Sequence, residues 1–124
     1  MGTDYARVSK QLSALGHPIR LRLMSLFHAV DEPLCVCELS DGLAIPDYQT
    51  SRHLKALSDA GWVSSTRDGV WIYYRLAEGL SSVDLSSLLS PMASDLKRMK
   101  ARLQQRKAGR CVIGPTKSGG DHAE

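Results

Sequence analysis

Several features that mark other classes of protein are missing from this 124-residue chain. No segment approaches the ~18 uninterrupted apolar residues of a membrane-spanning helix. The opening residues, MGTDYARVSKQL, lack the apolar core and small-residue cleavage site of a secretory signal. These absences predict a cytoplasmic protein with no membrane partner. No phosphate-binding loop or nucleophile–base–acid set is present either, so we expect no enzyme, no catalytic residue and no required cofactor.

Cysteine is also scarce, with only Cys35, Cys37 and Cys111. An odd number of cysteines in a reducing compartment argues against a disulfide framework. The first two have Cys-x-Cys spacing instead of the Cys-x-x-Cys of redox enzymes, and no βαβ pattern surrounds them. From the residues alone, ligation, catalysis and inert packing stay open for each cysteine.

The composition that is present is that of a folded domain. Hydrophobic residues make up 43% and charged residues 23% of the chain, and the net charge is +3. Much of the positive charge falls within residues 97–110, a stretch without any acid. We expect a single domain over residues 1–106, followed by a flexible Gly/Ser/Lys-rich tail over residues 107–124.

Apolar periodicity predicts a mainly α fold with one small β-hairpin. The expected helices are residues 4–15, a helix from Pro18, residues 34–41, residues 47–60, and a last helical region from Leu80. Two period-two runs, residues 62–66 and 70–76, flank Asp68-Gly69, a strong hairpin signal. In the last region, Pro91 either opens a restarted helix behind Ser90 or kinks one longer helix.

The third and fourth predicted helices have the lengths and tight connection of a helix-turn-helix, and the hairpin after them suits a wing. We therefore expect a winged helix-turn-helix of order α-α-α-α-β-β-α. Its recognition helix would enter the major groove, although a merely solvated surface helix is the alternative. For His53 on that helix, packing or hydrogen bonding is favoured over base reading. The candidate DNA-binding residues are Tyr48, Gln49, Thr50, Ser51, Arg52, His53, Lys55 and Arg67.

Three segments, LSALGHPIRLRLMSLF, LCVCELSDGL and SRHLKALSDAGWVSSTRDGVWIYYRL, resemble the ArsR/SmtB family over residues 12–76. This resemblance implies a homodimeric winged-helix repressor that binds operator double-stranded DNA until a metal or metalloid weakens that binding. The arsenic-responsive branch of the family carries a Cys-Val-Cys motif in the helix before the recognition helix. Residues 35–37 match that motif.

The chain departs from the family in two places. Ser40 stands where some arsenic sensors have a third cysteine, and residues 46–48, Pro-Asp-Tyr, replace the usual start of the recognition helix. The operator sequence is therefore not implied.

Thiolates select soft ions, and trivalent metalloids prefer three thiolate ligands. The expected inducer is As(III) or Sb(III) at Cys35 and Cys37, with Cys111 as third ligand or as a free tail thiol.

The spacing of the two motif cysteines suggests a mechanism. Side chains two residues apart on an ideal helix point about 200° apart. Ligation by both Cys35 and Cys37 should then require the start of their helix to unwind. We expect this distortion to weaken DNA binding through the helix-turn-helix connection.

Other sensing modes remain as alternatives. A zinc site of the family's mixed type would need His and Asp on the last helix, but residues 80–106 contain no His, and Asp84 and Asp95 are expected to be solvated. The N-terminus lacks the cysteines of the cadmium/lead branch. A Cd/Pb/Zn-responsive repressor, a thiol redox sensor and a helical adaptor without DNA binding are retained as alternatives.

The last helical region carries a heptad-like apolar seam, which an isolated monomer would expose. Its members are Leu85, Leu89, Met92, Leu96, Met99 and Leu103. The seam predicts a homodimer interface, and the family resemblance implies dimerisation through the first and last helices. Packing inside the monomer is the alternative. The basic stretch that overlaps the seam would attract phosphates or simply solvate a helix end.

Overall fold

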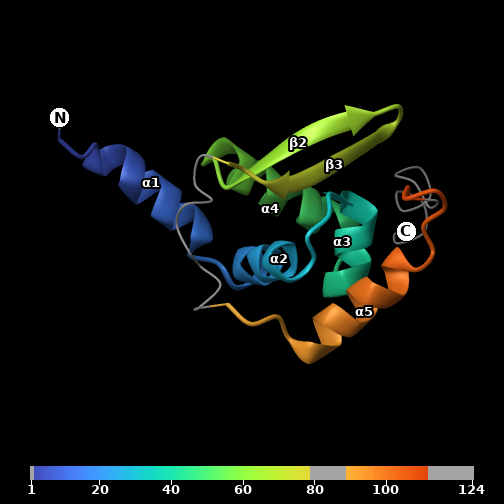
Figure 1. The fold of residues 1–124 in the computed structure, drawn as a ribbon. Coiled ribbons are helices and arrows are strands. Elements are labelled where there is room, and N and C mark those ends of the chain that lie inside the picture. Colours follow the sequence, from blue (N-terminus) through green and yellow to red (C-terminus); the bar gives the residue numbers. More distant parts are fainter. Residues whose placement is uncertain (1, 79–88, 112–124) are drawn as a thin grey trace.

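A helix-turn-helix and a β-hairpin wing organise the computed structural model, which describes residues 2–78 and 89–111 (Figure 1). In order the elements are α1 (Tyr5–Leu15), α2 (Pro18–Ala29), β1 (Leu34–Cys35), α3 (Val36–Leu43), α4 (Asp47–Asp59), β2 (Val63–Asp68), β3 (Trp71–Leu76) and α5 (Ala93–Leu103). The three strands form an antiparallel sheet of order β1-β3-β2. The predicted fold class is confirmed.

Local sequence explains most of the boundaries. The Asp4 carboxylate accepts a hydrogen bond from the Arg7 N–H and caps α1, and Pro18 occupies the first turn of α2. Between β2 and β3 the chain turns through two residues, and Gly69 there has a φ of +66°. That left-handed conformation suits glycine, so the Asp-Gly signal marks the hairpin correctly.

The third helix begins later than its sequence pattern predicts. Residues 34 and 35 pair with Tyr74 and Tyr73 of β3, and only then does α3 start. Helical periodicity is uninformative here because both residues are buried, Leu34 fully and Cys35 to 3% exposure. Pro33 therefore precedes a short strand, not the first turn of a helix.

The end of α3 also differs from the prediction. Gly42 lies inside the helix, and Ala44 ends it in a left-handed conformation with a φ of 59°. A Cβ added at Gly42 would lie 2.9 Å from Cε of Met99 on α5. The glycine thus allows α3 and α5 to pack closely together.

The last helix starts at Ala93, with Met92 as its N-cap and Pro91 outside it, so neither predicted role of Pro91 holds. Within the described residues, side chains of the apolar seam on α5 face the core of the chain. Met99 is fully buried, and Leu96 and Leu103 pack against the core of their own chain. Of the two interpretations, packing inside the monomer is correct for this part of the seam. The seam residue Leu85, like Asp84 and most of the segment from Leu80, lies outside the described residues.

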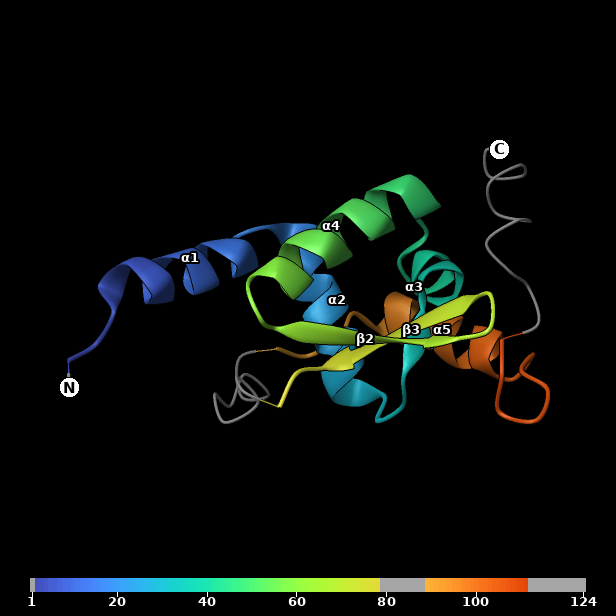
Figure 2. The same cartoon turned by 90° about the horizontal axis from the view of Figure 1, so that it is seen from above.

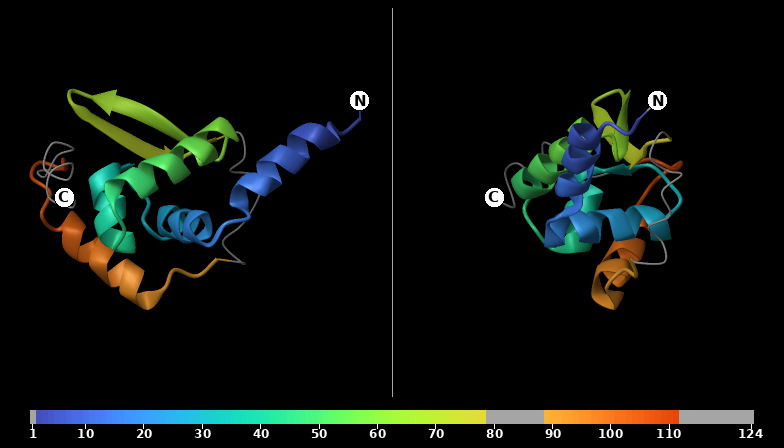
Figure 3. Two further views of the ribbon diagram at one scale, coloured as in Figure 1. Left: turned by 180° about the vertical axis from the view of Figure 1, so that it is seen from behind. Right: turned by 90° about the vertical axis from the view of Figure 1, so that its left-hand side faces the viewer.

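The helices and the wing form three levels in space. The hairpin lies on one side of α3, and α5 lies on the opposite side, as Figures 1 and 3 show. The core between them is mainly leucine; its fully buried members include Leu23, Leu26, Leu34, Leu39, Leu54 and Leu57.

Helix α1 projects from one end of the molecule (Figure 2). Only Ala14 and Leu15 of this helix are buried, whereas Tyr5 is 78% and Leu12 57% exposed. An exposed apolar stripe is therefore present, but it lies on α1 and not on α5. Over the described residues, no helix combines the length and apolarity that crossing a bilayer requires.

Candidate metal centre and nucleic-acid interface

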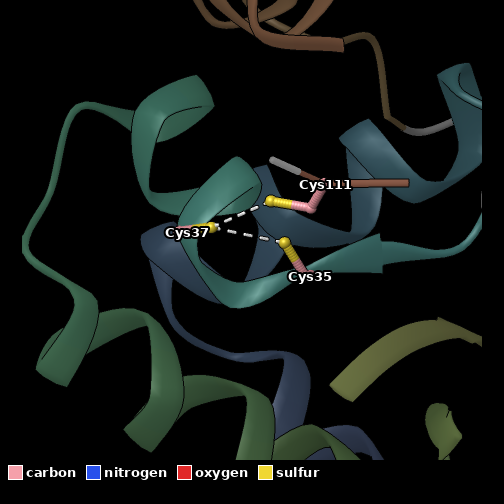
Figure 4. A group of neighbouring side chains, drawn as sticks. All are labelled: Cys35, Cys37 and Cys111. Atoms are coloured by element: carbon pink, nitrogen blue, oxygen red, sulfur yellow. Dashed lines mark hydrogen bonds between the residues drawn. The ribbon is translucent and has the colours of Figure 1, made fainter. Parts of the chain in front are cut away.

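The three cysteines meet at one buried point, although they come from three different segments. Cys35 ends β1, Cys37 lies in the first turn of α3, and Cys111 follows α5 (Figure 4). Their side chains are between 3% and 5% exposed. The Sγ atom of Cys37 lies 3.4 Å from Sγ of Cys35 and 3.4 Å from Sγ of Cys111, and all three sulfur atoms are within 4.8 Å of one another.

These sulfur separations suit a single thiophilic ion. With a metal–thiolate bond of about 2.3 Å, two ligating sulfur atoms lie about 3.3 Å apart at a right angle and about 3.8 Å apart at the tetrahedral angle. The observed separations fall in that range for two of the three pairs. Among the described residues, no histidine or carboxylate joins this cluster.

The position of Cys35 removes the need for helix unwinding. Cys35 is the N-cap of α3, with an extended backbone at φ −90° and ψ 167°, and therefore does not follow the helical rotation. Its side chain can face that of Cys37, which an ideal helix would not allow. The prediction that ligation must distort the start of α3 is wrong, because its premise placed both cysteines on one helix.

Residues beyond α5 fold back to deliver Cys111. Lys107 and Arg110 exchange backbone hydrogen bonds across a turn in which Ala108 and Gly109 have φ values of 53° and 74°. The N–H of Cys111 then donates to the hydroxyl of Tyr73 at 3.0 Å. The folded unit therefore reaches at least Cys111, past the predicted boundary at residue 106, and the interpretation of Cys111 as a loose tail thiol does not hold. The remaining predicted tail lies outside the described residues.

A buried arginine, which the sequence analysis missed, touches two of the thiols. Nη2 of Arg102 lies 3.3 Å from Sγ of Cys37 and 3.2 Å from Sγ of Cys111, and Nε donates to Asp41 at 2.8 Å. Arg102 is only 3% exposed. Its third nitrogen, Nη1, is buried without a hydrogen-bond partner among the described residues. The thiols thus share their cavity with a fixed positive charge.

Arg102 belongs to a row of arginines that recur every four residues, at 98, 102, 106 and 110. Arg98 and Arg102 therefore share one face of α5, whereas Arg106 and Arg110 lie beyond the end of that helix at Leu103. Each guanidinium of the row pairs with a carboxylate: Arg98 with Asp95, Arg102 with Asp41, Arg106 with Glu38 and Glu32, and Arg110 with Asp68. Their four-residue spacing is the feature of the sequence that could have revealed this row of arginines. The row is a structural clamp on α3 and the wing, which neither interpretation of the basic stretch anticipated.

Two of the carboxylates are fully buried. Asp95 binds Arg22 and Arg98, so the expectation that it is solvated is wrong. Glu38 accepts two hydrogen bonds of 2.6 Å from Arg106 and one of 3.1 Å from the backbone N–H of Cys35. The latter contact holds the first cysteine in its capping conformation.

The shared environment shifts the thiol pKa values. The sulfur hydrogen bonds with Cys111 and Cys37, followed by burial, raise the pKa of Cys35. The hydrogen bond with Cys111 chiefly raises the pKa of Cys37 to about 12. Burial alone would lower the pKa of Arg102, but its hydrogen bond to Cys111 and its electrostatic interactions with Cys111, Cys37 and Asp41 raise it. An incoming ion must therefore displace protons from Cys35 and Cys37 beside a permanently charged guanidinium.

The predicted recognition helix, α4, presents part of its candidate set to solvent. Tyr48, Ser51, Arg52 and Lys55 are exposed, Gln49 is half-buried, and Arg67 on β2 is exposed. Thr50 is fully buried and accepts a hydrogen bond from Ser40 at 2.8 Å. His53 is 6% exposed and accepts one from Arg20 at 3.1 Å. These two side chains therefore serve packing and should be removed from the set of DNA contacts.

A cleft of about 390 Å³ joins the thiols to this surface. Cys35 and Cys37 form one wall, the start of α4 forms a second, and the wing forms the third. Its lining residues are Cys35, Val36, Cys37, Asp47, Tyr48, Ser51, Val70, Trp71, Ile72 and Tyr74. The candidate centre and the DNA-facing elements are therefore neighbours.

Comparison with known proteins places the chain among transcriptional regulators. Residues 17–65 match the family described as bacterial regulatory protein, arsR family. An HTH-type transcriptional regulator from Methanocaldococcus jannaschii is 32% identical over 60% of this chain and 82% of its own length. The arsenic resistance transcriptional regulator ArsR1 from Pseudomonas putida is 45% identical over 43% of this chain and 41% of its own length. The chain thus spans about half the length, or less, of several curated relatives that it matches.

A solved structure supports the fold. The homodimeric winged helix-turn-helix DNA-binding domain of Mb0332 from Mycobacterium bovis superimposes with a TM-score of 0.59. The match covers 71% of this chain and 83% of that domain at 23% identity. At this identity the likeness establishes the architecture alone.

Proposed function

Because the chain belongs to the ArsR family of bacterial regulatory proteins, we propose that it is a cytoplasmic transcriptional repressor that binds operator DNA as a homodimer. As(III) or Sb(III), held by the thiolates of Cys35, Cys37 and Cys111, would release it from that DNA. The observation that carries this proposal is the convergence of three buried sulfur atoms within 4.8 Å. Membership of a family of regulatory proteins confirms that the chain is not an enzyme.

The donor set favours a trivalent metalloid over zinc. Structural or regulatory zinc takes four ligands, commonly including histidine, whereas the cluster offers three sulfur atoms and, over the described residues, no nitrogen or carboxylate ligand. Three thiolates neutralise a trivalent centre, as in As(OH)₃ + 3 R–SH → As(SR)₃ + 3 H₂O. The sulfur atoms already lie close together, so little of the binding energy is lost to rearrangement.

Two contacts connect the centre to the recognition helix. Arg102 touches two thiols and holds Asp41 in the last turn of α3. In the same turn Ser40 donates to Thr50 of α4. When the thiolates close around an ion, the contacts between Arg102 and the sulfur atoms change in geometry, and α3, which Arg102 holds through Asp41, shifts with them. We propose this adjustment, in place of helix unwinding, as the coupling between the two sites.

The wing is tied to the centre through the C-terminal turn. Tyr73 of β3 holds the backbone of Cys111, and Arg110 pairs with Asp68 at the hairpin end of β2 at 3.0 Å. Movement of the turn on ligation would therefore alter the position of the wing relative to α4. Both DNA-facing elements are then affected, which is the arrangement that a ligand-released repressor requires.

On the DNA side we propose contacts from α4 and the wing. The residues retained are Tyr48, Gln49, Ser51, Arg52, Lys55 and Arg67. For the dimer we propose the exposed stripe of Tyr5 and Leu12 on α1 as the main contact, with α5 contributing its outer face. A twofold dimer predicts a near-palindromic operator with half-sites about one DNA turn apart.

A thiol redox repressor is the second candidate, favoured by one observation. The sulfur atoms of Cys37 and Cys111 lie 3.4 Å apart, so oxidation could join them. A bond between Cys35 and Cys37 would be strained by their close spacing in the chain. Peroxide-induced release from DNA that a reductant reverses, in protein free of metalloid, would favour this candidate.

The deciding experiment is a titration of the dimer on its upstream promoter DNA, followed by fluorescence anisotropy. As(III), Sb(III), Cd(II) and Zn(II) are added separately to the wild type and to Cys35→Ser, Cys37→Ser and Cys111→Ser variants. We expect As(III) and Sb(III) to release the wild type and each substitution to weaken the response about tenfold or more. Val36→Ser, which introduces serine between the two motif cysteines without removing a thiol, serves as a matched control that retains metalloid binding. Unchanged operator affinity in saturating As(III) would overturn the proposal.

A further inference from the structure

We propose that Arg102 determines which ions the thiol site accepts, by favouring complexes that carry a net negative charge. This inference rests on the proposed function of the three cysteines as a ligand set. It concerns a residue that is not itself a ligand. Arg102 acts through its charge and position.

The charged groups around the centre explain how the Arg102 guanidinium can influence ion binding. Its Nη2 atom lies 3.2 Å and 3.3 Å from two of the sulfur atoms, and its side chain is 3% exposed. Its partner Asp41 has a side chain that is 42% exposed, so water screens the carboxylate but not the guanidinium. Glu38 is buried nearby, but Arg106 neutralises it through two hydrogen bonds. The charged group in direct contact with the sulfur atoms of Cys37 and Cys111 is therefore a positive one.

Trivalent and divalent ions differ in the charge of the complex they form. Three thiolates around As(III) give a neutral As(SR)₃. A soft divalent ion reacts as M²⁺ + 3 R–SH → [M(SR)₃]⁻ + 3 H⁺ and leaves an anion. At an effective dielectric constant of about 20, a positive charge some 3–4 Å away stabilises such an anion by more than the factor of ten in affinity that decides selectivity.

The hydrogen bonds of the guanidinium support the same conclusion. An anionic sulfur complex strengthens the hydrogen bonds that Nη2 already directs at two of the sulfur atoms, whereas a neutral complex accepts hydrogen bonds weakly. We therefore expect this site to hold Cd(II) or Pb(II) more tightly than the same three thiols would without Arg102.

The test measures direct ion binding by the ultraviolet thiolate-to-metal charge-transfer absorbance, for Cd(II) and As(III) separately. Arg102→Met removes the charge, and Arg102→Lys keeps it without the planar fork. Lys100→Met removes one charge from an exposed position on the same helix and serves as the matched control. We expect Arg102→Met to weaken Cd(II) binding by about tenfold or more while As(III) binding changes by less than about threefold. Arg102→Lys should fall between the wild type and Arg102→Met for Cd(II).

Two results would overturn the inference while leaving the proposed function intact. If Arg102→Met weakens Cd(II) and As(III) binding equally, the residue merely holds the cysteines in place. If neither affinity changes, or if Lys100→Met reproduces the selective loss, the guanidinium does not act on the complex. Failure of the wild type to bind As(III) at all would instead remove the proposed function, and the inference with it.

Discussion

The first and last described helices contribute to the same core in opposite ways. Helix α5 buries Asp95, Met99 and Arg102, and its Arg102 forms an ion pair with Asp41 of α3. Helix α1 buries only its last two residues and leaves Tyr5 and Leu12 in solvent. One terminal helix thus packs into the chain's own interior, and the other leaves an apolar stripe exposed. The family resemblance implies that the first and last helices form the dimer interface together. In this chain the two helices contribute unequally to the stability of the monomer.

Truncation of one side chain on each helix should expose this difference most strongly. Met99→Ala removes a fully buried side chain that touches Gly42, and we expect it to lower the free energy of unfolding by about 2–5 kcal/mol. Leu12→Ala, on the exposed stripe, should cost about 0.5 kcal/mol or less in a monomer. Urea denaturation at a single low protein concentration measures both. Equal losses would contradict the contrast between the helices.

A charge on the exposed stripe should affect assembly more than folding. We expect Leu12→Asp to convert the proposed dimer to a monomer in sedimentation experiments at micromolar concentration, because it places a carboxylate in an apolar contact. Lys10→Gln changes the net charge by the same amount about 200° around the helix, and it should remain dimeric. A Leu12→Asp protein that stays dimeric would place the interface elsewhere.

The smallest expected effect concerns pH at the base of α1. Arg20 links α1 to α4, since it donates to both the Ala14 carbonyl and the His53 ring. Burial, followed by the charges of His17 and Arg20, lowers the pKa of His53 below its ordinary value of 6.5. The unfolded chain then binds more protons than the folded one, so this contribution is present above about pH 6.5 and is lost as pH falls below that value.

Replacing the imidazole tests this assignment. His53→Gln keeps a hydrogen-bond acceptor for Arg20 but does not titrate. We expect its urea midpoint to fall less than that of the wild type between about pH 7.5 and 5.5. Parallel falls in the two proteins would mean that other groups, such as His17, account for the acid sensitivity.

The regular elements could be predicted because their signals are local. Helical periodicity located α1, α2 and α4 to within a residue or two, and Asp-Gly located the hairpin. The boundary at Leu34–Cys35 could not be placed this way. Its strand pairing depends on β3, some forty residues later in the chain. Because both side chains are buried, they show neither the helical period nor the two-residue period of a strand.

The candidate site was predictable in its residues but not in its geometry. The family resemblance identified Cys35 and Cys37, and elimination suggested Cys111. Their convergence depends on a turn with left-handed Ala108 and Gly109, which composition alone suggested was a loose tail. The ion pairs of Arg102 and Arg106 join residues 61 and 68 positions apart. Such pairs leave no mark in local pattern beyond the four-residue spacing of the arginines.

Cys111 lies 74 positions along the chain from Cys37, and this separation would give the proposed inducer a second effect. An ion held by both residues acts as a removable cross-link that closes most of the domain into a loop. A covalent bridge over a loop of this size is worth about 4–5 kcal/mol by restricting the unfolded chain. In general, a ligand that binds only the folded form stabilises it by an amount that grows with the logarithm of the ligand concentration divided by its dissociation constant. The ion that detaches the repressor from DNA would therefore also prolong the lifetime of the detached protein against unfolding and proteolysis.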